Sequence, residues 1–260
     1  PPFNGEEGNE VADADRLLRQ FVRPEDWLDE PELPVPWIVQ DLLAEGSLTM
    51  LSAYPKEGKS TYARHLALAV ARGENFLGKR TNQGTVLYFA LEEMERDVRA
   101  KFRALGIEKG DPLLLRFHSA YPTIVNDLRV LVQRERPRLI VIDTLVRLPK
   151  PKFDMADYFA VSEWLNPLLN IAHECDCTIL VVYHSNKTGR GVEGADSITT
   201  IMGSTALGAM IDQLIYITQS KEGVRAYGTV GRFPAISPTL MSFDEETQRL
   251  DVIGEKAEVK

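Results

Sequence analysis

From residue 46 onward, short apolar runs alternate with amphipathic stretches. The apolar runs contain many β-branched residues, which predicts strands at 46–53, 85–91, 113–118, 138–143 and 178–184. Between them, apolar residues recur every three to four positions, which predicts helices at 59–70, 94–105, 124–135 and 158–174. Such alternation is typical of a largely parallel sheet that is covered by helices on both faces.

The pattern changes after the segment "STALGAMID" at 204–212. Short apolar runs then follow one another with only turn-like polar residues between them, at 213–219, 225–231, 239–243 and 249–253. Consecutive strands with short connections favour antiparallel pairing. The predicted fold class is therefore α/β: a mostly parallel twisted sheet flanked by helices, with an antiparallel C-terminal edge.

The first 45 residues do not fit this pattern. Residues 13–21 suit a short helix, and 24–37 are so rich in proline that an extended arm is expected. Trp27, Trp37 and Ile38 would be its apolar anchors, on this subunit or on a neighbour. We therefore predict an acidic, proline-rich extension over 1–45 and one domain over 46–260.

Composition adds two constraints. Residues 1–45 carry 12 acidic and 3 basic side chains, whereas the other 215 carry 26 and 27, so the net charge of −8 does not exclude an anionic partner of the domain. No apolar run approaches the length of about 20 residues that a membrane helix needs, and the start has no signal-peptide layout. With only two cysteines, Cys175 and Cys177, which are expected to be structural, we predict a soluble protein of the cytoplasm.

The segment "SAYPKEGKST" at 52–61 resembles the phosphate-loop pattern G-x-x-x-x-G-K-[ST], with alanine in place of the first glycine. Such a loop turns backbone N–H groups around phosphate oxygens at a helix N-terminus. Alanine is harmless at the first position unless the backbone there needs a positive φ. Because the loop lies between a predicted strand and a predicted helix, a plain surface turn is much the weaker interpretation. The predicted nucleotide-binding residues are Ala53, Pro55, Lys56, Glu57, Gly58, Lys59, Ser60 and Thr61.

Three residues of this loop have separate roles. Gly58 is the position that tolerates a side chain least. Lys59 supplies a charge for the β- and γ-phosphates, and the Ser60 hydroxyl can complete the coordination shell of Mg²⁺. The expected cofactors are therefore ATP and Mg²⁺.

Acidic and polar side chains follow three other predicted strands. Asp143 ends "RLIVID", where a carboxylate can hold Mg²⁺, as in a Walker B strand. Glu92 and Glu93 follow "TVLYFA"; both could merely complement a helix dipole, but Glu92 is our choice for the general base. His184, at the end of "TILVVYH", can contact the γ-phosphate, although a strand histidine is as often simply hydrogen-bonded.

The order of "AYPKEGKST", "FALEEME", "LIVIDT", "VVYHSNK" and "GSTALGAMIDQLIYI" resembles the RepA-like branch of the RecA-like ATPases. This branch includes a hexameric plasmid replicative helicase and is related to the DnaB-type helicases. The similarity extends over about residues 31–253. It implies a RecA-like core with Lys59 and Ser60 on phosphate and Mg²⁺, Glu92 as catalytic carboxylate, Asp143 as Walker B residue and His184 as γ-phosphate sensor.

The resemblance also implies a homo-oligomer, a hexameric ring with nucleotide sites between subunits. Arg232 in "TVGRF" stands where the family's arginine finger is expected, although it could be an ordinary exposed strand residue. Two loops, 147–158 and 186–203, are implied at a central channel that contacts single-stranded DNA; as glycine-rich, mildly basic segments they equally suit plain surface loops. The basic side chains implied there are Arg147, Lys150, Lys152, Lys187 and Arg190.

These residues support three functions. The first is an ATP-hydrolysing ring motor on single-stranded DNA, most like a replicative helicase of a plasmid, phage or mobile element. The second is an ATP-dependent assembly protein of the recombinase or switch type that does not unwind DNA, which the modest basic content favours somewhat. The third, a degenerate nucleotide-binding scaffold, conflicts with the full catalytic set.

Overall fold

The computed structural model describes residues 16–118, 120, 122–149, 154, 157–185, 205–220 and 223–255. The chain divides into two compact units, Pro1–Val35 and Pro36–Lys260. In the first unit, residues 16–18 are helical and Pro24–Asp26 form a 3₁₀ turn, and its large apolar side chains are exposed, Trp27 to 51%. All the elements below belong to the second unit.

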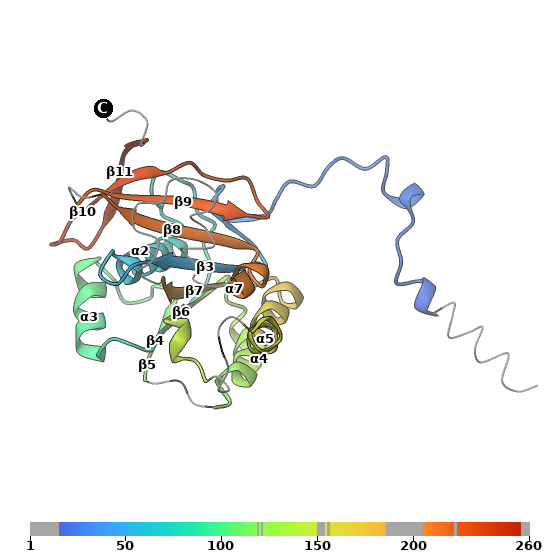
Figure 1. The fold of residues 1–260 in the computed structure, drawn as a ribbon, viewed down its shortest axis with the longest axis horizontal. Coiled ribbons are helices and arrows are strands. Elements are labelled where there is room, and N and C mark those ends of the chain that lie inside the picture. Colours follow the sequence, from blue (N-terminus) through green and yellow to red (C-terminus); the bar gives the residue numbers. More distant parts are fainter. Residues whose placement is uncertain are drawn as a thin grey trace, which may run out of the picture. The chain divides into compact units, whose positions relative to one another are not determined.

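Nine strands of the described chain form one sheet, in the order β11-β10-β9-β8-β3-β7-β6-β4-β5 (Figure 1). The strands from β8 to β5 in this order are mutually parallel, and β9, β10 and β11 extend the sheet with antiparallel pairs. The predicted fold class is confirmed. The strands are β3 (Leu48–Ala53), β4 (Val86–Ala90), β5 (Leu113–Phe117), β6 (Leu139–Asp143), β7 (Thr178–His184), β8 (Gln213–Gln219), β9 (Arg225–Gly231), β10 (Thr239–Phe243) and β11 (Leu250–Glu255).

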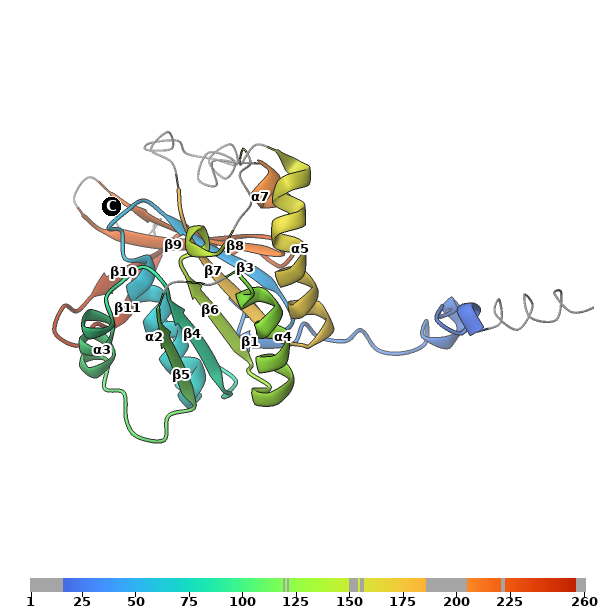
Figure 2. The same cartoon turned by 90° about the horizontal axis from the view of Figure 1, so that it is seen from below.

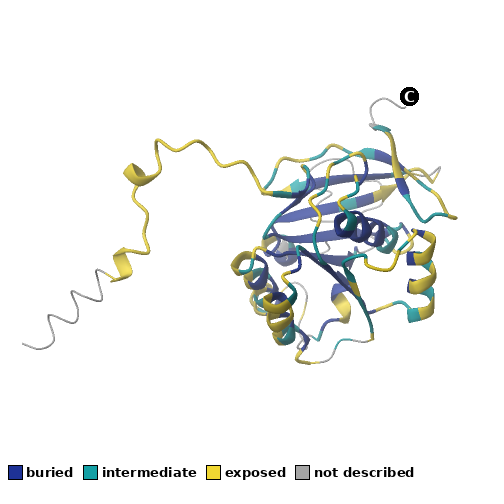
Figure 3. Cartoon of the chain, turned by 180° about the vertical axis from the view of Figure 1, so that it is seen from behind, coloured by how far each residue is buried: buried dark blue, intermediate teal, exposed yellow. Residues whose placement is uncertain are grey.

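Helices cover both faces of the sheet (Figure 2). The apolar sides of α2 (Lys59–Arg72) and α3 (Glu95–Ala104) pack on one face, in a core with alternate strand residues such as Leu51 and Val141. The helices α4 (Ile124–Glu135), α5 (Tyr158–Glu174) and α7 (Thr205–Ala209) cover the other face. The strands between these layers are buried almost throughout, as the dark blue ribbons in Figure 3 show. Burial on both faces explains their continuous apolar runs.

The compact unit begins at Pro36, ten residues before the boundary predicted at 45/46. Two short strands, β1 (Trp37–Val39) and β2 (Leu43–Ala44), pair with each other. Ile38, Leu42 and Leu43 are completely buried in the core that contains α2. Strands of two and three residues have too few positions to show a period, and the prolines before them suggested a continuous arm, so the sequence pattern hid this part of the domain.

Parallel strands bring their carboxyl ends to one edge of the sheet. The register pairs Ala53 of β3 with His184 of β7, and Ala90 of β4 with Asp143 of β6. The phosphate loop, the Glu92 segment, Asp143 and His184 therefore meet at this carboxyl edge. In the described part of the chain, every helix is too short or too polar to cross a membrane.

Candidate nucleotide site

The loop between β3 and α2 has the backbone that a phosphate loop requires. Gly58, the N-cap of α2, is left-handed with φ = 98°, a conformation that glycine adopts without strain. Ala53, at the position of the missing first glycine, ends β3 as an extended, buried residue whose φ is not positive. The alanine therefore replaces a glycine whose conformational freedom is not used.

Lys59 is buried in the first turn of α2, with 4% of its surface exposed. Its Nζ donates hydrogen bonds to the carbonyl oxygens of Ala53 at 2.9 Å and Tyr54 at 2.7 Å. Burial lowers the pKa of Lys59 to about 8, although the negative charges of Glu57, Asp143 and Glu92 oppose this. Within the described residues the ammonium forms no ion pair, so a buried cation faces the loop with neutral oxygens as its partners. A phosphate is the ligand that such a group favours.

The remaining loop residues surround this lysine. Tyr54 N donates to the Glu57 carboxylate at 3.1 Å, which fixes the turn from inside. Pro55 and Lys56 are exposed, and Lys56 is left-handed with φ = 69°. Thr61 lies partly buried on α2, where it accepts a hydrogen bond of 3.4 Å from Arg64.

Ser60 and Asp143 lie within hydrogen-bond distance of each other. The Ser60 hydroxyl donates to Asp143 Oδ1 at 3.2 Å, and the Tyr88 hydroxyl donates to Oδ2 at 2.8 Å. Burial raises the pKa of Asp143, although both hydrogen bonds and the charge of Arg64 act in the opposite direction. A hydroxyl and a carboxylate oxygen at the mouth of a phosphate loop are the hard donors that Mg²⁺ prefers. This donor set fits the metal predicted from the sequence.

Glu92 and His184 are in contact. His184 Nε2 lies 3.1 Å from Glu92 Oε2, and about a third of each side chain is exposed. The second imidazole nitrogen, Nδ1, is buried and has no hydrogen-bond partner in the described part of the chain. The sequence placed both residues at the same edge, and the structure joins them into a pair. A movement of the His184 side chain can thus shift the Glu92 carboxylate directly.

Glu93 has a different environment from Glu92. It accepts a hydrogen bond of 2.9 Å from Arg64 and forms an ion pair with Lys101. Burial opposes its ionisation, but Arg64 and Lys101 together outweigh this effect and lower the pKa of Glu93. A carboxylate held by two cations is a poor proton acceptor. This difference supports Glu92 as the general base.

One residue of this edge escaped the sequence analysis. A Cβ atom placed on Gly58 would lie 3.7 Å from Nε of Arg225, at the start of β9. That Nε is buried and, among the described residues, has no hydrogen-bond partner, while the guanidinium lies 5.5 Å from the centre of the Phe243 ring. The contact depends on the β8–β9 and β9–β10 pairing, so no local motif could signal it. It places a second positive charge beside the loop.

Arg232 lies at the opposite edge of the sheet. It follows Gly231, which pairs with Gln213 at the start of β8. Its Nη1 is 3.1 Å from Asp212 Oδ1, and 64% of its side chain is exposed. Arg232 therefore lies away from the phosphate loop of its own chain.

The predicted DNA-contacting residues lie mostly outside the described residues: Lys150, Lys152, Lys187 and Arg190. Arg147 is described, in the 3₁₀ turn Leu145–Arg147 that follows β6, and it is exposed.

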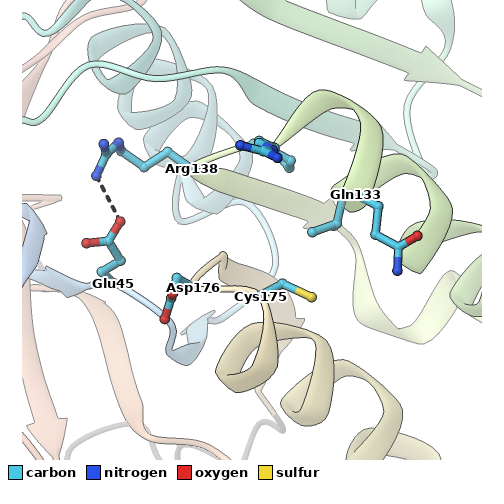
Figure 4. Close-up of a pocket in the computed structure, with 8 residues that line it drawn as sticks. Glu45, Gln133, Arg138, Cys175 and Asp176 are labelled. Atoms are coloured by element: carbon cyan, nitrogen blue, oxygen red, sulfur yellow. Dashed lines mark hydrogen bonds and ion pairs between the residues drawn. The ribbon is translucent and has the colours of Figure 1, made fainter.

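Two cavities lie at opposite edges of the sheet. One of about 320 Å³ borders Glu92 and Glu93 and continues to Phe117, the last residue of β5, and to His118. A larger one of about 550 Å³ lies at the amino edge, where Arg138 pairs with Glu45 beside Gln133, Cys175 and Asp176 (Figure 4). The larger cavity is remote from the loop. Since phosphate loops bind by wrapping their backbone around the ligand, cavity size does not decide where the chemistry occurs.

Comparison with solved structures shows how widely the fold is shared. The chain is similar to a solved structure that is described as an ATPase domain, with a TM-score of 0.63 and 14% sequence identity, over 95% of this chain and 99% of that one. This similarity supports the RecA-like P-loop fold. Altogether 509 chains of solved structures match, so the fold by itself selects no function.

Sequence comparison is more specific. None of the curated proteins matches the chain. The AAA domain family, however, matches residues 13–190, which is more than half of the sequence and includes the phosphate loop, Glu92, Asp143 and His184. With the loop geometry and the P-loop fold, this match identifies an ATPase domain: the chain belongs to the AAA domain family.

Proposed function

We propose that this chain binds ATP with Mg²⁺ and hydrolyses it at the carboxyl edge of its sheet. The observation that carries the proposal is the meeting of Lys59, Ser60, Asp143 and the Glu92–His184 pair around one left-handed glycine. When bound, the metal would neutralise charge on the phosphates. Ser60 and Asp143 would hold it, and the loop N–H groups with Lys59 would hold the phosphates.

Glu92 is the proposed general base. Its side chain is partly exposed, so a water molecule can reach it, and it would orient that water and accept its proton. His184 is the proposed γ-phosphate sensor. Since its imidazole touches Glu92, the sensor and the base form one unit that can change when the terminal phosphate leaves.

The motor is proposed to be a homo-oligomeric ring, a hexamer that acts on single-stranded DNA, most like a RepA-type replicative helicase of a plasmid, phage or mobile element. The order of the motifs supports this, and so does the placement of Arg232 away from the chain's own loop, where it can serve as a finger for a neighbour. Basic side chains of 147–158 and 186–203, including Lys150, Lys152, Lys187 and Arg190, are the proposed DNA contacts. Such a motor works in the cytoplasm, where the free thiols of Cys175 and Cys177 stay reduced.

The experiment that tests this proposal measures ATP turnover with and without single-stranded DNA, while light scattering records particle size. Turnover by a hexamer that rises with DNA supports the motor. Turnover that ignores DNA, in a protein that assembles with ATP, would instead indicate the recombinase-type or switch-type assembly ATPase. Absence of ATP binding would refute both.

A further inference from the structure

Asp143 is held by a tyrosine that no motif includes. Tyr88 lies on β4, and its strand partner on β6 is Val141, two residues before Asp143. Paired residues of neighbouring strands point to the same face of a sheet, and so do alternate residues along one strand. Tyr88, its partner Val141 and Asp143 therefore share one face, the face that α2 and α3 cover. The phenolic oxygen therefore reaches Asp143 diagonally across the two strands, at 2.8 Å from Oδ2.

The position of this tyrosine is tightly fixed. Only 1% of its surface is exposed, and its ring packs edge-on against Phe102 of α3, with 5.4 Å between the ring centres. A carboxylate offers only acceptor oxygens, so the phenolic O–H is the donor of this hydrogen bond. The bond therefore has one direction, from Tyr88 to Asp143.

The two oxygens of Asp143 have separate partners. Oδ2 is held by Tyr88, which leaves Oδ1 on the side of Ser60. Without the phenol, the carboxylate could rotate about χ2, and the buried Oδ2 would lose the hydrogen bond that satisfies it. The hydroxyl thus selects which oxygen faces the mouth of the phosphate loop.

We infer that Tyr88 is a positioning residue for the metal: by holding Oδ2 of Asp143, it presents Oδ1 beside Ser60 as a ready oxygen donor. This inference rests on the proposed function, because it assigns the metal of that site to Ser60 and Asp143. Partners that orient a ligand in this way typically change metal affinity by about 10- to 100-fold. The role is separable from phosphate binding, which the loop N–H groups and Lys59 provide.

The test is Tyr88→Phe, which removes one oxygen and keeps the ring. Binding of Mn²⁺ to the ATP-loaded protein is measured by electron paramagnetic resonance, and binding of ATP in EDTA by calorimetry. We expect Mn²⁺ affinity to fall at least about tenfold, while ATP affinity in EDTA stays within about twofold, because only the metal donor is disturbed. That retained affinity also shows that the variant is folded.

Tyr62→Phe is the matched control. Tyr62 is also fully buried, on α2, but its hydroxyl has no hydrogen-bond partner among the residues that the structure describes. Removing it should change neither affinity. A second control is Asp143→Asn: if Tyr88 acts through Asp143, adding Tyr88→Phe to that variant should lower Mn²⁺ affinity no further.

Three results would overturn the inference. Unchanged Mn²⁺ affinity of Tyr88→Phe would show that the hydroxyl does not position the carboxylate. Equal losses of ATP and Mn²⁺ affinity would show a general structural role. If the wild-type protein itself bound neither ATP nor Mn²⁺, the proposed function would fail together with this inference, and this result is distinguishable because it appears before any substitution is made.

Discussion

Asp143 and Asp212 are both buried aspartates of the central sheet, but they lie at opposite edges. Asp143, at the carboxyl edge, has two hydroxyl groups as its hydrogen-bond partners, those of Ser60 and Tyr88. Asp212, just before β8 at the amino edge, accepts from the backbone N–H of Leu48 at 2.8 Å and lies 3.1 Å from both His173 and Arg232.

The different partners of the two aspartates indicate different roles: Asp143 is suited to bind a cation, whereas Asp212 stabilises the fold. The backbone N–H of Leu48 donates to the carboxylate of Asp212, and the guanidinium of Arg232 and the imidazole of His173 lie beside it, so this residue links β8, β3 and α5. Neutral hydroxyls satisfy Asp143 only partly, and burial raises its pKa. A group that is incompletely compensated in the protein gains more from an added cation. This difference agrees with our proposal that the metal binds at the carboxyl edge.

The largest expected effect is at Lys59. Lys59→Ala should reduce ATP turnover by several orders of magnitude, because it removes the charge that stabilises the β- and γ-phosphates. A steady-state phosphate-release assay measures this. Arg138→Ala, which breaks a partly exposed ion pair with Glu45 at the amino edge, is the control and should leave turnover within about twofold. Equal losses of ATP turnover in both variants would contradict the assignment of the chemistry to the carboxyl edge alone.

Substitution of Arg232 tests whether a residue at the amino edge of one subunit takes part in ATP hydrolysis at the carboxyl edge of another. Arg232→Ala should bind ATP normally and hydrolyse it about 10³-fold more slowly, as losses of arginine fingers do. Lysine should not restore the rate fully, because it lacks the planar fork of donors. Nucleotide binding by calorimetry and turnover measured in parallel separate the two effects.

Mixing subunits decides whether Arg232 acts on a neighbour. Glu92→Gln should bind ATP and turn it over slowly, since it keeps the shape and loses the base. In mixed rings of Arg232→Ala and Glu92→Gln subunits, some interfaces join an intact Glu92 to an intact Arg232. Partial activity should return. An inactive mixture with verified co-assembly, or wild-type turnover by Arg232→Ala alone, would refute the shared site.

The two aspartates should differ in their effects on stability. Asp212→Ala leaves the buried N–H of Leu48 without its partner and should lower the free energy of unfolding by about 2–3 kcal/mol, with ATP affinity in EDTA unchanged. Asp143→Asn keeps an oxygen acceptor for one of the two hydroxyls and turns an amide N–H, which can donate to the oxygen of the other hydroxyl, toward the second one. It also removes a charge that burial disfavours, so stability should fall less than in Asp212→Ala. Urea unfolding of both variants checks this. A larger loss for Asp143→Asn than for Asp212→Ala would reverse our assignment of the two edges.

Sequence patterns predicted the elements well because most of them are long and buried on both faces. The helix at 158–174 and the strand at 178–184 have the bounds that the pattern gave. The sequence also predicted which residues at strand ends lie together, because parallel topology alone brings Asp143 and His184 to one edge.

What the sequence could not supply were contacts that depend on register. Arg225 reaches Gly58 through the pairing of β8 with β9, and Tyr88 reaches Asp143 across two strands. Neither has a local signature, since the partners are distant in sequence. The different environments of Glu92 and Glu93 likewise depend on Arg64 and Lys101, which come from two helices.

The smallest expected effect concerns the missing glycine of the phosphate loop. Ala53 is a buried strand residue without a positive φ, so Ala53→Gly should leave ATP affinity within about twofold and cost about 0.5–1 kcal/mol of stability through added backbone freedom.

Gly58→Ala is the counterpart of this substitution. There φ is 98°, a backbone conformation that costs alanine about 1–2 kcal/mol, so this strain should displace the loop and weaken ATP binding; the new Cβ would make only an ordinary contact with Arg225, at 3.7 Å. Calorimetry on both variants compares them directly. A large gain in affinity for Ala53→Gly would show that alanine impairs the loop, whereas unchanged affinity for Gly58→Ala would show that the left-handed turn is dispensable.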